Sequence, residues 1–373
     1  MALVVLRRRF FRFGLLALII VATIASVIGL SPQILPALAA RSEMEGCLRG
    51  IFTARALGLF NGNYEGLEAY YNTDTSSGLY ALNHEIGRIK YFREWVKQRQ
   101  INLSGIKLDL AIVDAGVEGD KAWASVSQHM IIAYHHRGED EATVNELGVR
   151  TIHWVDLERK NGEWVISLEW YWDPFEIHSL EPEVAPGTAR CSLPLPAPPP
   201  GEYNRSAAVA YADRYSGVRH GPGDGRYNNK DYRDYTGLGG DCANFVSQVL
   251  SDEKAGGIPP DWNWNEGSTA WLQAEALVYY LLDSGLAVKI MRGSFQEVTA
   301  ATEEYPQGAV YVLHPGDIIG YEEKGEIGHV SIVVGRDSAG YVLVNSHTAD
   351  RYHMPWDLGW DKYTTYWLLQ IVY

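Results

Sequence analysis

A proline-dense segment divides this chain of 373 residues into two parts. Residues 180–203 read LEPEVAPGTARCSLPLPAPPPGEY and contain seven of the 16 prolines. Because proline fixes φ and has no backbone N–H, such a segment fits neither the interior of a helix nor the middle of a sheet. We therefore expect an extended, semi-rigid linker over residues 179–202, with a folded domain on each side.

The first 40 residues indicate a targeting segment rather than part of a folded domain. Four arginines in residues 7–12 precede an uncharged apolar run over residues 14–30, and small residues follow at 37–39. Two interpretations stay open: a cleaved signal peptide, and an uncleaved membrane anchor whose basic end remains inside. Both export the rest of the chain to the cell envelope or beyond, with membrane contact through this segment alone.

Residues 43–178 are expected to form an α+β domain, with helices first and a curved antiparallel sheet after them. Apolar residues recur at helical spacing over 47–72 and 79–100. The period then changes to two, and the Gly119–Asp120 and Asn161–Gly162 pairs predict turns between strands. This order resembles the cone-shaped nuclear-transport-factor-like fold, and we find no catalytic set within it.

Charge and motif content exclude several classes of function. The net charge of −14 argues against binding to nucleic acid or to an anionic surface. No H-E-x-x-H motif and no closely spaced Cys/His pairs occur, so we expect neither a metal nor another cofactor. The histidines of the first domain are interpreted as residues on the sheet surface: His129, His135, His136 and His153.

Residues 203–373 are expected to form a second α+β domain. The sequence predicts a helix over 204–216 and then a loop rich in glycine, asparagine and aspartate. Strands are expected at 309–313, 316–321, 329–335, 341–347 and 366–373.

A cysteine stands at the start of a second predicted helix in this domain, in the sequence GDCANFVSQ. Asp241 is a suitable N-cap, and Gly256 and Gly257 end the helix. At a helix start, unpaired N–H groups and the helix dipole favour a thiolate over a thiol, and the same N–H groups can hold an oxyanion. Cys242 is therefore either a nucleophile or an ordinary core residue on the apolar face of the helix.

The chain has three cysteines, an odd number for an exported protein. Cysteines outside the cytoplasm tend to form disulfides. Cys47 and Cys191 either bridge or remain reduced, and in both cases Cys242 is the cysteine left over.

A thiolate nucleophile requires an imidazole, and His329 is the best candidate because it begins a strand beside a glycine. A third polar group would orient that ring. The residues at and after the following strand offer three choices: His347, Asn345 and Asp350.

The register of two predicted strands decides which of these groups meet. If Gly335 pairs with Tyr341, His329 lies directly opposite His347, and a register tighter by two places Asn345 there instead. Directly opposed side chains have Cβ atoms about 4.5–5.5 Å apart, close enough for an orienting hydrogen bond. A register shifted by an odd number would send both side chains to the wrong side of the sheet.

Four segments of the second domain, NRSAAVAYADRYS, GGDCANFVSQVL, GHVSIVVG and SHTADRY, together resemble the putative amidase domain family of exported bacterial proteins. More distantly, the order of DC, HPGDIIGY and HVSIVVG is similar to the NlpC-type and CHAP cell-wall enzymes. The resemblance implies a papain-like fold in which a helix-start cysteine packs on an antiparallel sheet. It further implies Cys242 as nucleophile, His329 as base, and His347 or Asn345 as the orienting residue.

These observations predict an exported cysteine amidohydrolase. Its expected substrate is an amide bond in peptidoglycan stem peptides, on the basis of the export segment and the resemblance. Two alternatives stay open: an acyltransferase or protease that uses the same thiol, and a non-catalytic protein that binds the cell wall.

Overall fold

The computed structural model describes residues 34–175, 183–188, 191, 194–218, 229–238, 240–348 and 350–373. The apolar run predicted at residues 14–30 lies outside these ranges. Helix α2 (Ile34–Asn61) begins within the predicted targeting segment and continues into the first domain. Among the described residues, we find no helix whose length and apolar character would suit a membrane span.

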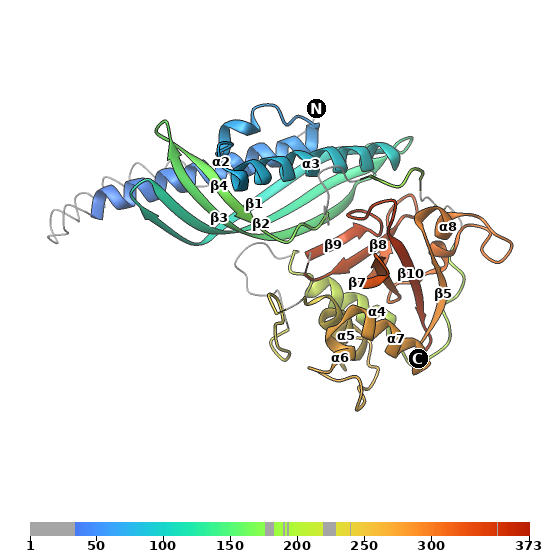
Figure 1. The fold of residues 1–373 in the computed structure, drawn as a ribbon. Coiled ribbons are helices and arrows are strands. Elements are labelled where there is room, and N and C mark those ends of the chain that lie inside the picture. Colours follow the sequence, from blue (N-terminus) through green and yellow to red (C-terminus); the bar gives the residue numbers. More distant parts are fainter. Residues whose placement is uncertain are drawn as a thin grey trace.

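The N-terminal domain has its helices first and its antiparallel sheet after them, as predicted. Figure 1 shows α2 and α3 along one face of a long, curved sheet. Side chains between these helices and the sheet form one continuous apolar core. The elements are α2, η1 (Leu67–Tyr70), α3 (Ser76–Gln98), β1 (Ile101–Glu118), β2 (Lys121–His136), β3 (Asn145–Lys160) and β4 (Glu163–Trp170).

Both predicted turns are confirmed. Strand β1 pairs with β2 up to Glu118 and Lys121, and Gly119 between them has a φ of 59°. Asn161 and Gly162 join β3 to β4 with φ values of 54° and 89°. Two successive residues with positive φ match the two-residue hairpin turn that Asn-Gly favours.

The C-terminal domain places helices on both faces of a second antiparallel part of the sheet. Helices α4, α5, α6 and α7 pack on one face, and α8 packs on the other. Its helices are α4 (Arg205–Arg214), α5 (Cys242–Ser251), α6 (Thr269–Leu272), α7 (Ala274–Asp283), α8 (Phe295–Thr299) and η2 (Ala309–Val312). Its strands are β5 (Ala287–Gly293), β6 (Ile318–Glu323), β7 (Glu326–Arg336), β8 (Val342–Ser346), β9 (Asp350–Pro355) and β10 (Thr365–Ile371).

The strand predicted at 309–313 is wrong, because residues 309–312 form the short 3-10 helix η2. Gly308 precedes it with a φ of 100°, and a Cβ there would lie 2.6 Å from the carbonyl oxygen of Thr299. A short apolar run does not distinguish a buried strand from a buried helical turn. The tight backbone approach at Gly308 turns the chain in this case.

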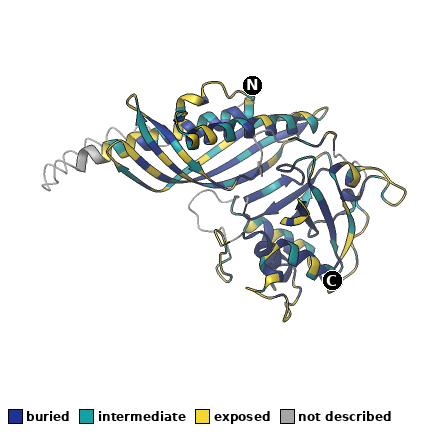
Figure 2. Cartoon of the chain, in the orientation of Figure 1, coloured by how far each residue is buried: buried dark blue, intermediate teal, exposed yellow. Residues whose placement is uncertain are grey.

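One sheet runs through both domains. Its strand order is β1-β2-β3-β9-β8-β7-β6-β10-β5, and β4 pairs with the N-terminal part of this path at β3. The junction is the antiparallel pair β3–β9, in which Gly148 lies opposite Tyr352 and Arg150 opposite Asp350. Figure 2 shows buried residues along both parts of the sheet and in α5.

The described parts of the predicted linker contain no helix or strand and pack against both domains. Arg99, after α3, donates hydrogen bonds to the carbonyl oxygens of Ala185 and Gly187, each at 2.7 Å. The backbone N–H of Cys191 donates to the carbonyl oxygen of Ala339. The segment therefore follows the surface of the protein and is held to it by hydrogen bonds.

A buried carboxylate also joins the domains. Asp357 accepts hydrogen bonds from Trp95 Nε1 at 3.0 Å, Arg99 Nε at 2.8 Å and the Tyr341 hydroxyl at 2.6 Å. Trp95 and Arg99 belong to the N-terminal domain, whereas Tyr341 and Asp357 belong to the C-terminal domain. The Arg99 and Asp357 side chains are both almost completely buried.

We predict that Asp357→Ala destabilises the whole protein by about 3–5 kcal/mol, because it leaves the Arg99 charge buried without its carboxylate. Urea unfolding of the full chain measures this difference. The matched control is Glu94→Ala, which removes the exposed ion pair with Lys97 and should cost at most about 1 kcal/mol. Similar losses in the two variants would contradict the assignment.

Candidate active site

Cys242 is the first residue of α5, as predicted. All ten residues of this helix are buried, and Cys242 keeps 6 % of its surface exposed. Its helix packs against β7 and β8 within the same apolar core as α4 and α7. Cys242 therefore lies in the first turn of a packed helix, with a small part of the residue exposed.

Asp241, the residue before this cysteine, stands at the predicted N-cap position and bonds to residues outside the helix. Asp241 is the N-cap of α5, but its side chain makes no capping hydrogen bond. Its carboxylate instead lies 2.7 Å from His347 Nδ1 and accepts a hydrogen bond from Asn244 Nδ2 at 2.6 Å. The backbone N–H of Asp241 donates to Thr348 Oγ1. The start of α5 is thus bonded to the two residues that follow β8.

His347 is the imidazole that the structure brings to the start of α5. Its ring stacks on Phe245, one helical turn after Cys242, with 4.1 Å between ring centroids. Nδ1 faces the Asp241 carboxylate, and Nε2 lies 2.6 Å from the carbonyl oxygen of Tyr215. With Asp241 ionised, both partners only accept hydrogen bonds, so this arrangement favours a proton on each ring nitrogen and the imidazolium form of His347.

The pKa of His347 agrees with that protonation state. Burial opposes a charged ring, but the hydrogen bond and charge of Asp241, together with the charge of Asp350, outweigh it. The pKa of His347 is consequently raised above its ordinary value.

The predicted register of β7 and β8 is wrong. Gly335 pairs with Leu343 rather than with Tyr341, and an irregularity follows before Val333 pairs with Val344. This bulge leaves Val334 as an extra residue in β7 and shifts the remaining pairs by an odd number. His329 and His347 consequently face opposite sides of the sheet.

His329 lies on the face of the sheet opposite to α5, the helix that begins with Cys242. It pairs directly with Tyr321 in β6, and its ring contacts Tyr321 and Trp360 in the core on the far side of the sheet. Burial, together with the charge of Arg351, lowers the pKa of His329 well below its ordinary value. Its Nε2 atom has no hydrogen-bond partner among the described residues. Cys242 packs in the apolar core on the opposite face, and the role of His329 as its base stays a prediction.

Asn345, the other predicted orienting residue, lies on the same face as His347 but has different partners. Its side-chain Nδ2 donates to Asp213 Oδ1 at 3.0 Å, and its Oδ1 accepts from the backbone N–H of His353 at 2.7 Å. Asn345 thus links α4 to β9. The carboxylate of Asp241 occupies the orienting position that the sequence left to His347 or Asn345.

None of the three cysteines forms a disulfide. Cys47 Sγ donates to the carbonyl oxygen of Trp164 at 3.1 Å, and burial raises the pKa of Cys47 to about 11. Cys191 Sγ donates to the side-chain oxygen of Gln307. The disulfide that the sequence left open between Cys47 and Cys191 is therefore absent.

The interpretation of the N-terminal histidines as surface residues is wrong, because all four are buried: His129, His135, His136 and His153. His136 Nε2 lies 2.6 Å from Asp337, and His153 Nδ1 lies 2.7 Å from Glu169. Within the described ranges, no three His, Cys, Asp or Glu side chains are placed to hold a metal ion.

Residues 202–369 match the model of a protein family described as "Putative amidase domain". This part of the chain is therefore similar to that family. The resemblance inferred from the sequence is confirmed, and the family description points to hydrolysis of amide bonds. The papain-like fold and the more distant similarity to NlpC-type and CHAP enzymes stay predictions.

Among curated proteins, the chain is similar to "Uncharacterized protein YjcM" of Bacillus subtilis (strain 168), with 29 % identity over 155 residues. The match includes 41 % of this chain and 32 % of the relative, so it spans about a third of that protein's length.

Two solved structures are also similar to part of the chain. The intermembrane space region of chloroplast protein ARC6 has a TM-score of 0.26 and 11 % identity over 34 % of this chain and 92 % of that chain. An NTF2-like protein of unknown function from Pseudomonas putida KT2440 has a TM-score of 0.22 and 16 % identity over 38 % of this chain and 93 % of that chain. TM-scores this low do not bear on the fold or the function.

We predict that Asp241→Asn lowers the pKa of His347, because burial then acts on the ring without an opposing carboxylate. In the wild-type protein the raised pKa contributes stability that is fully present below about pH 6.5, the ordinary histidine value. That stability is lost as the pH rises through the folded pKa. The advantage of wild type over Asp241→Asn in free energy of unfolding should therefore shrink as the pH rises.

Nuclear magnetic resonance titration of the His347 ring and urea unfolding at several pH values measure the two effects. An advantage that grows with pH, or an unchanged titration of His347 in the variant, would show that Asp241 does not control this ring.

Proposed function

We propose that the C-terminal domain is a cysteine amidohydrolase that uses Cys242 as nucleophile and His347 as its acid and base. The observation that carries this proposal is the bond between His347 and Asp241, the residue directly before Cys242. It fixes a protonated imidazole at the same helix start that carries the thiol. A cysteine beside a protonated histidine at a helix start is favoured as a thiolate.

In this proposal the Cys242 thiolate attacks the carbonyl carbon of the amide, and the carbonyl oxygen becomes an oxyanion. Backbone N–H groups in the first turn of α5 hold that charge. The Asp241 side chain makes no capping hydrogen bond to them. The carbon–nitrogen bond then breaks, and His347 gives a proton to the departing amine. In this step the Nε2–H of His347 gives up its hydrogen bond to the carbonyl oxygen of Tyr215 and donates to the amine nitrogen instead.

The resulting thioester is released by water. Neutral His347 takes a proton from the attacking water, the carbon–sulfur bond breaks, and the protein returns to the thiolate with a protonated ring. Asp241 retains Nδ1–H throughout, which keeps the ring orientation and stabilises the imidazolium.

The location and substrate of the proposed enzyme rest on the sequence. The basic and apolar residues at the N-terminus support export, either as a cleaved signal peptide or as an anchor. Peptidoglycan stem peptides offer amide bonds to an exported bacterial enzyme, and the resemblance to cell-wall amidases supports this substrate. The net charge of −14 supports a partner other than nucleic acid.

We predict that Cys242→Ala reduces release of new termini from purified peptidoglycan by roughly 10³-fold or more, as expected when a nucleophile is removed. Mass spectrometry of the digested polymer measures this loss and identifies the bond. Cys47→Ala and Cys191→Ala are the matched controls, and both should retain activity because neither thiol lies at α5.

A second pair of variants separates the two histidines. His347→Ala should lower activity by about 10²–10⁴-fold, the usual contribution of a general acid and base. His329→Phe keeps a ring between Tyr321 and Trp360 and should retain activity. The reverse result would restore His329 as the base and overturn the role of His347. Preferential transfer of the acyl group to a low concentration of an added amine, rather than to water, would instead identify an acyltransferase.

A further inference from the structure

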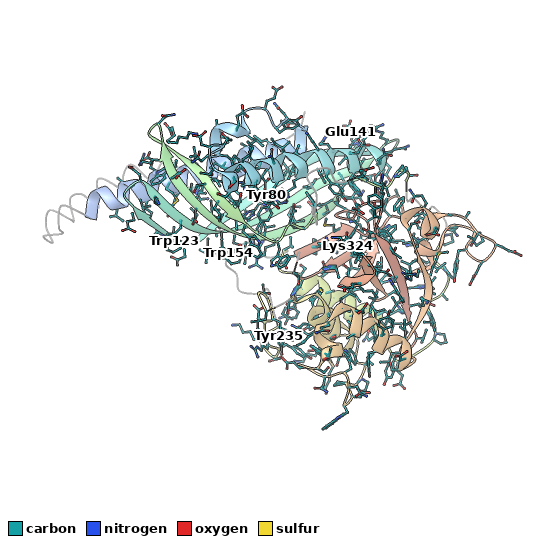
Figure 3. The ribbon with its side chains drawn as sticks, in the orientation of Figure 1. Tyr80, Trp123, Glu141, Trp154, Tyr235 and Lys324 are labelled. Carbon is teal, nitrogen blue, oxygen red and sulfur yellow. The ribbon has the colours of Figure 1, made fainter. Side chains whose placement is uncertain are left out.

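Four tryptophans are exposed on one face of the N-terminal sheet, the face turned away from α2 and α3. They are Trp123, Trp154, Trp170 and Trp172, each between 47 % and 49 % exposed. Figure 3 shows Trp123 and Trp154 on this side of the sheet. Tryptophan is normally largely buried, so a group of half-exposed indoles on one surface indicates a binding site.

The indoles form a surface with defined geometry. Trp154 and Trp170 are direct cross-strand partners in β3 and β4, with 5.2 Å between ring centroids, and Trp172 follows at 5.5 Å from Trp170. Trp123 lies over Gly116, where a Cβ would be 2.5–3.1 Å from three atoms of the indole. Glycine at this position therefore lets the ring lie flat on the sheet.

Polar side chains surround Trp123 in a groove on the same face. The groove is lined by carboxylates, a lysine and a hydroxyl, among them Glu118, Lys121, Asp156, Glu158 and Ser167. Carboxylates beside an aromatic ring accept hydrogen bonds from hydroxyl groups while the ring contacts C–H bonds. This combination suits a polyhydroxylated ring and repels anionic lipid or nucleic acid.

The tryptophan face is continuous with the face that carries the candidate active site. In β3, Arg150 and Trp154 point to the same side because side chains alternate along a strand. Arg150 Nη1 pairs with Asp350 Oδ2 at 2.9 Å across the β3–β9 junction, and the charge of Asp350 acts on His347. The four residue steps from Arg150 to Trp154 span about 13 Å of strand.

We propose that the tryptophan face binds the saccharide strand of the polymer whose amide is cleaved in the C-terminal domain. The indoles stack on the apolar faces of successive sugar rings, and the groove carboxylates accept hydrogen bonds from their hydroxyl groups. The identity of the polymer rests on the proposed function, whereas saccharide binding rests on the tryptophan face itself. Such binding holds the glycan on one domain while its peptide branch reaches the other.

The test is isothermal titration calorimetry, in which tetra-N-acetylchitotetraose is added to the full chain carrying Cys242→Ala. Saturable binding is expected, and adding Trp154→Ala or Trp170→Ala should weaken it by about tenfold or more, in line with the loss of stacking. Trp154→Tyr keeps an aromatic face and should retain most of the affinity. Trp262→Ala removes a tryptophan that is 94 % exposed in the C-terminal domain and should leave binding unchanged.

Absent binding, or equal binding in the Trp154→Ala, Trp170→Ala and Trp262→Ala chains, would overturn the inference. Tryptophan-dependent adsorption to phosphatidylcholine vesicles, or tryptophan-dependent self-association in sedimentation, without saccharide binding would overturn it in favour of another occupant. Because binding is measured without the thiol, the two proposals fail separately. Cleavage without saccharide binding removes only this inference, and saccharide binding without cleavage removes only the proposed enzyme activity.

Discussion

The bond between Asp241 and His347 determines how the candidate active site is assembled. It connects the start of α5 to the end of β8, and the other ring nitrogen of His347 connects both to the end of α4 at Tyr215. Three separate elements thus meet at one charged ring. A buried imidazolium is costly unless acceptors face both nitrogens, and the fold supplies a carboxylate and a carbonyl oxygen.

Asp241 also illustrates how local preference and site chemistry diverge. Aspartate at an N-cap normally satisfies N–H groups of the first turn with its own side chain. Here the side chain turns to His347 and Asn244 instead. The Asp241 side chain therefore makes no capping hydrogen bond to the first turn of α5, whose N–H groups hold the oxyanion in the proposed mechanism. The local capping rule is broken at the residue that orients His347 in the proposed mechanism.

Much of the fold could be predicted because it depends on local patterns. Period-two alternation and the Asn161–Gly162 turn identified the long N-terminal strands, and helical spacing identified α3. Cys242 at the start of α5 followed from its flanking residues. The pairing of strands was harder to predict, because the single extra residue Val334 changes which side chains of β7 and β8 lie on the same face. No feature of the sequence distinguishes Val334 from its neighbours, so His329 was assigned to the wrong face.

Long-range contacts were the other part that the sequence did not reveal. His136 and His153 are buried with carboxylate partners, Asp337 from the C-terminal domain and Glu169 from the neighbouring strand β4. The role of Asp241 likewise depends on where β8 ends, which no spacing indicates. Strand β9 was missed because it is short and has charged residues at its start, and its partner β3 belongs to the other domain.

The pairing of β9 with β3 has a consequence for how the C-terminal domain can be handled. If the chain were cut within the proline-dense segment, the half that carries Cys242 would keep β9 but lose its neighbour. The backbone groups along that edge would then be open to strands of other molecules, which is a common origin of aggregation. The N-terminal half thus covers the edge of β9 with its own strand β3. The C-terminal half is best regarded as part of a larger folding unit.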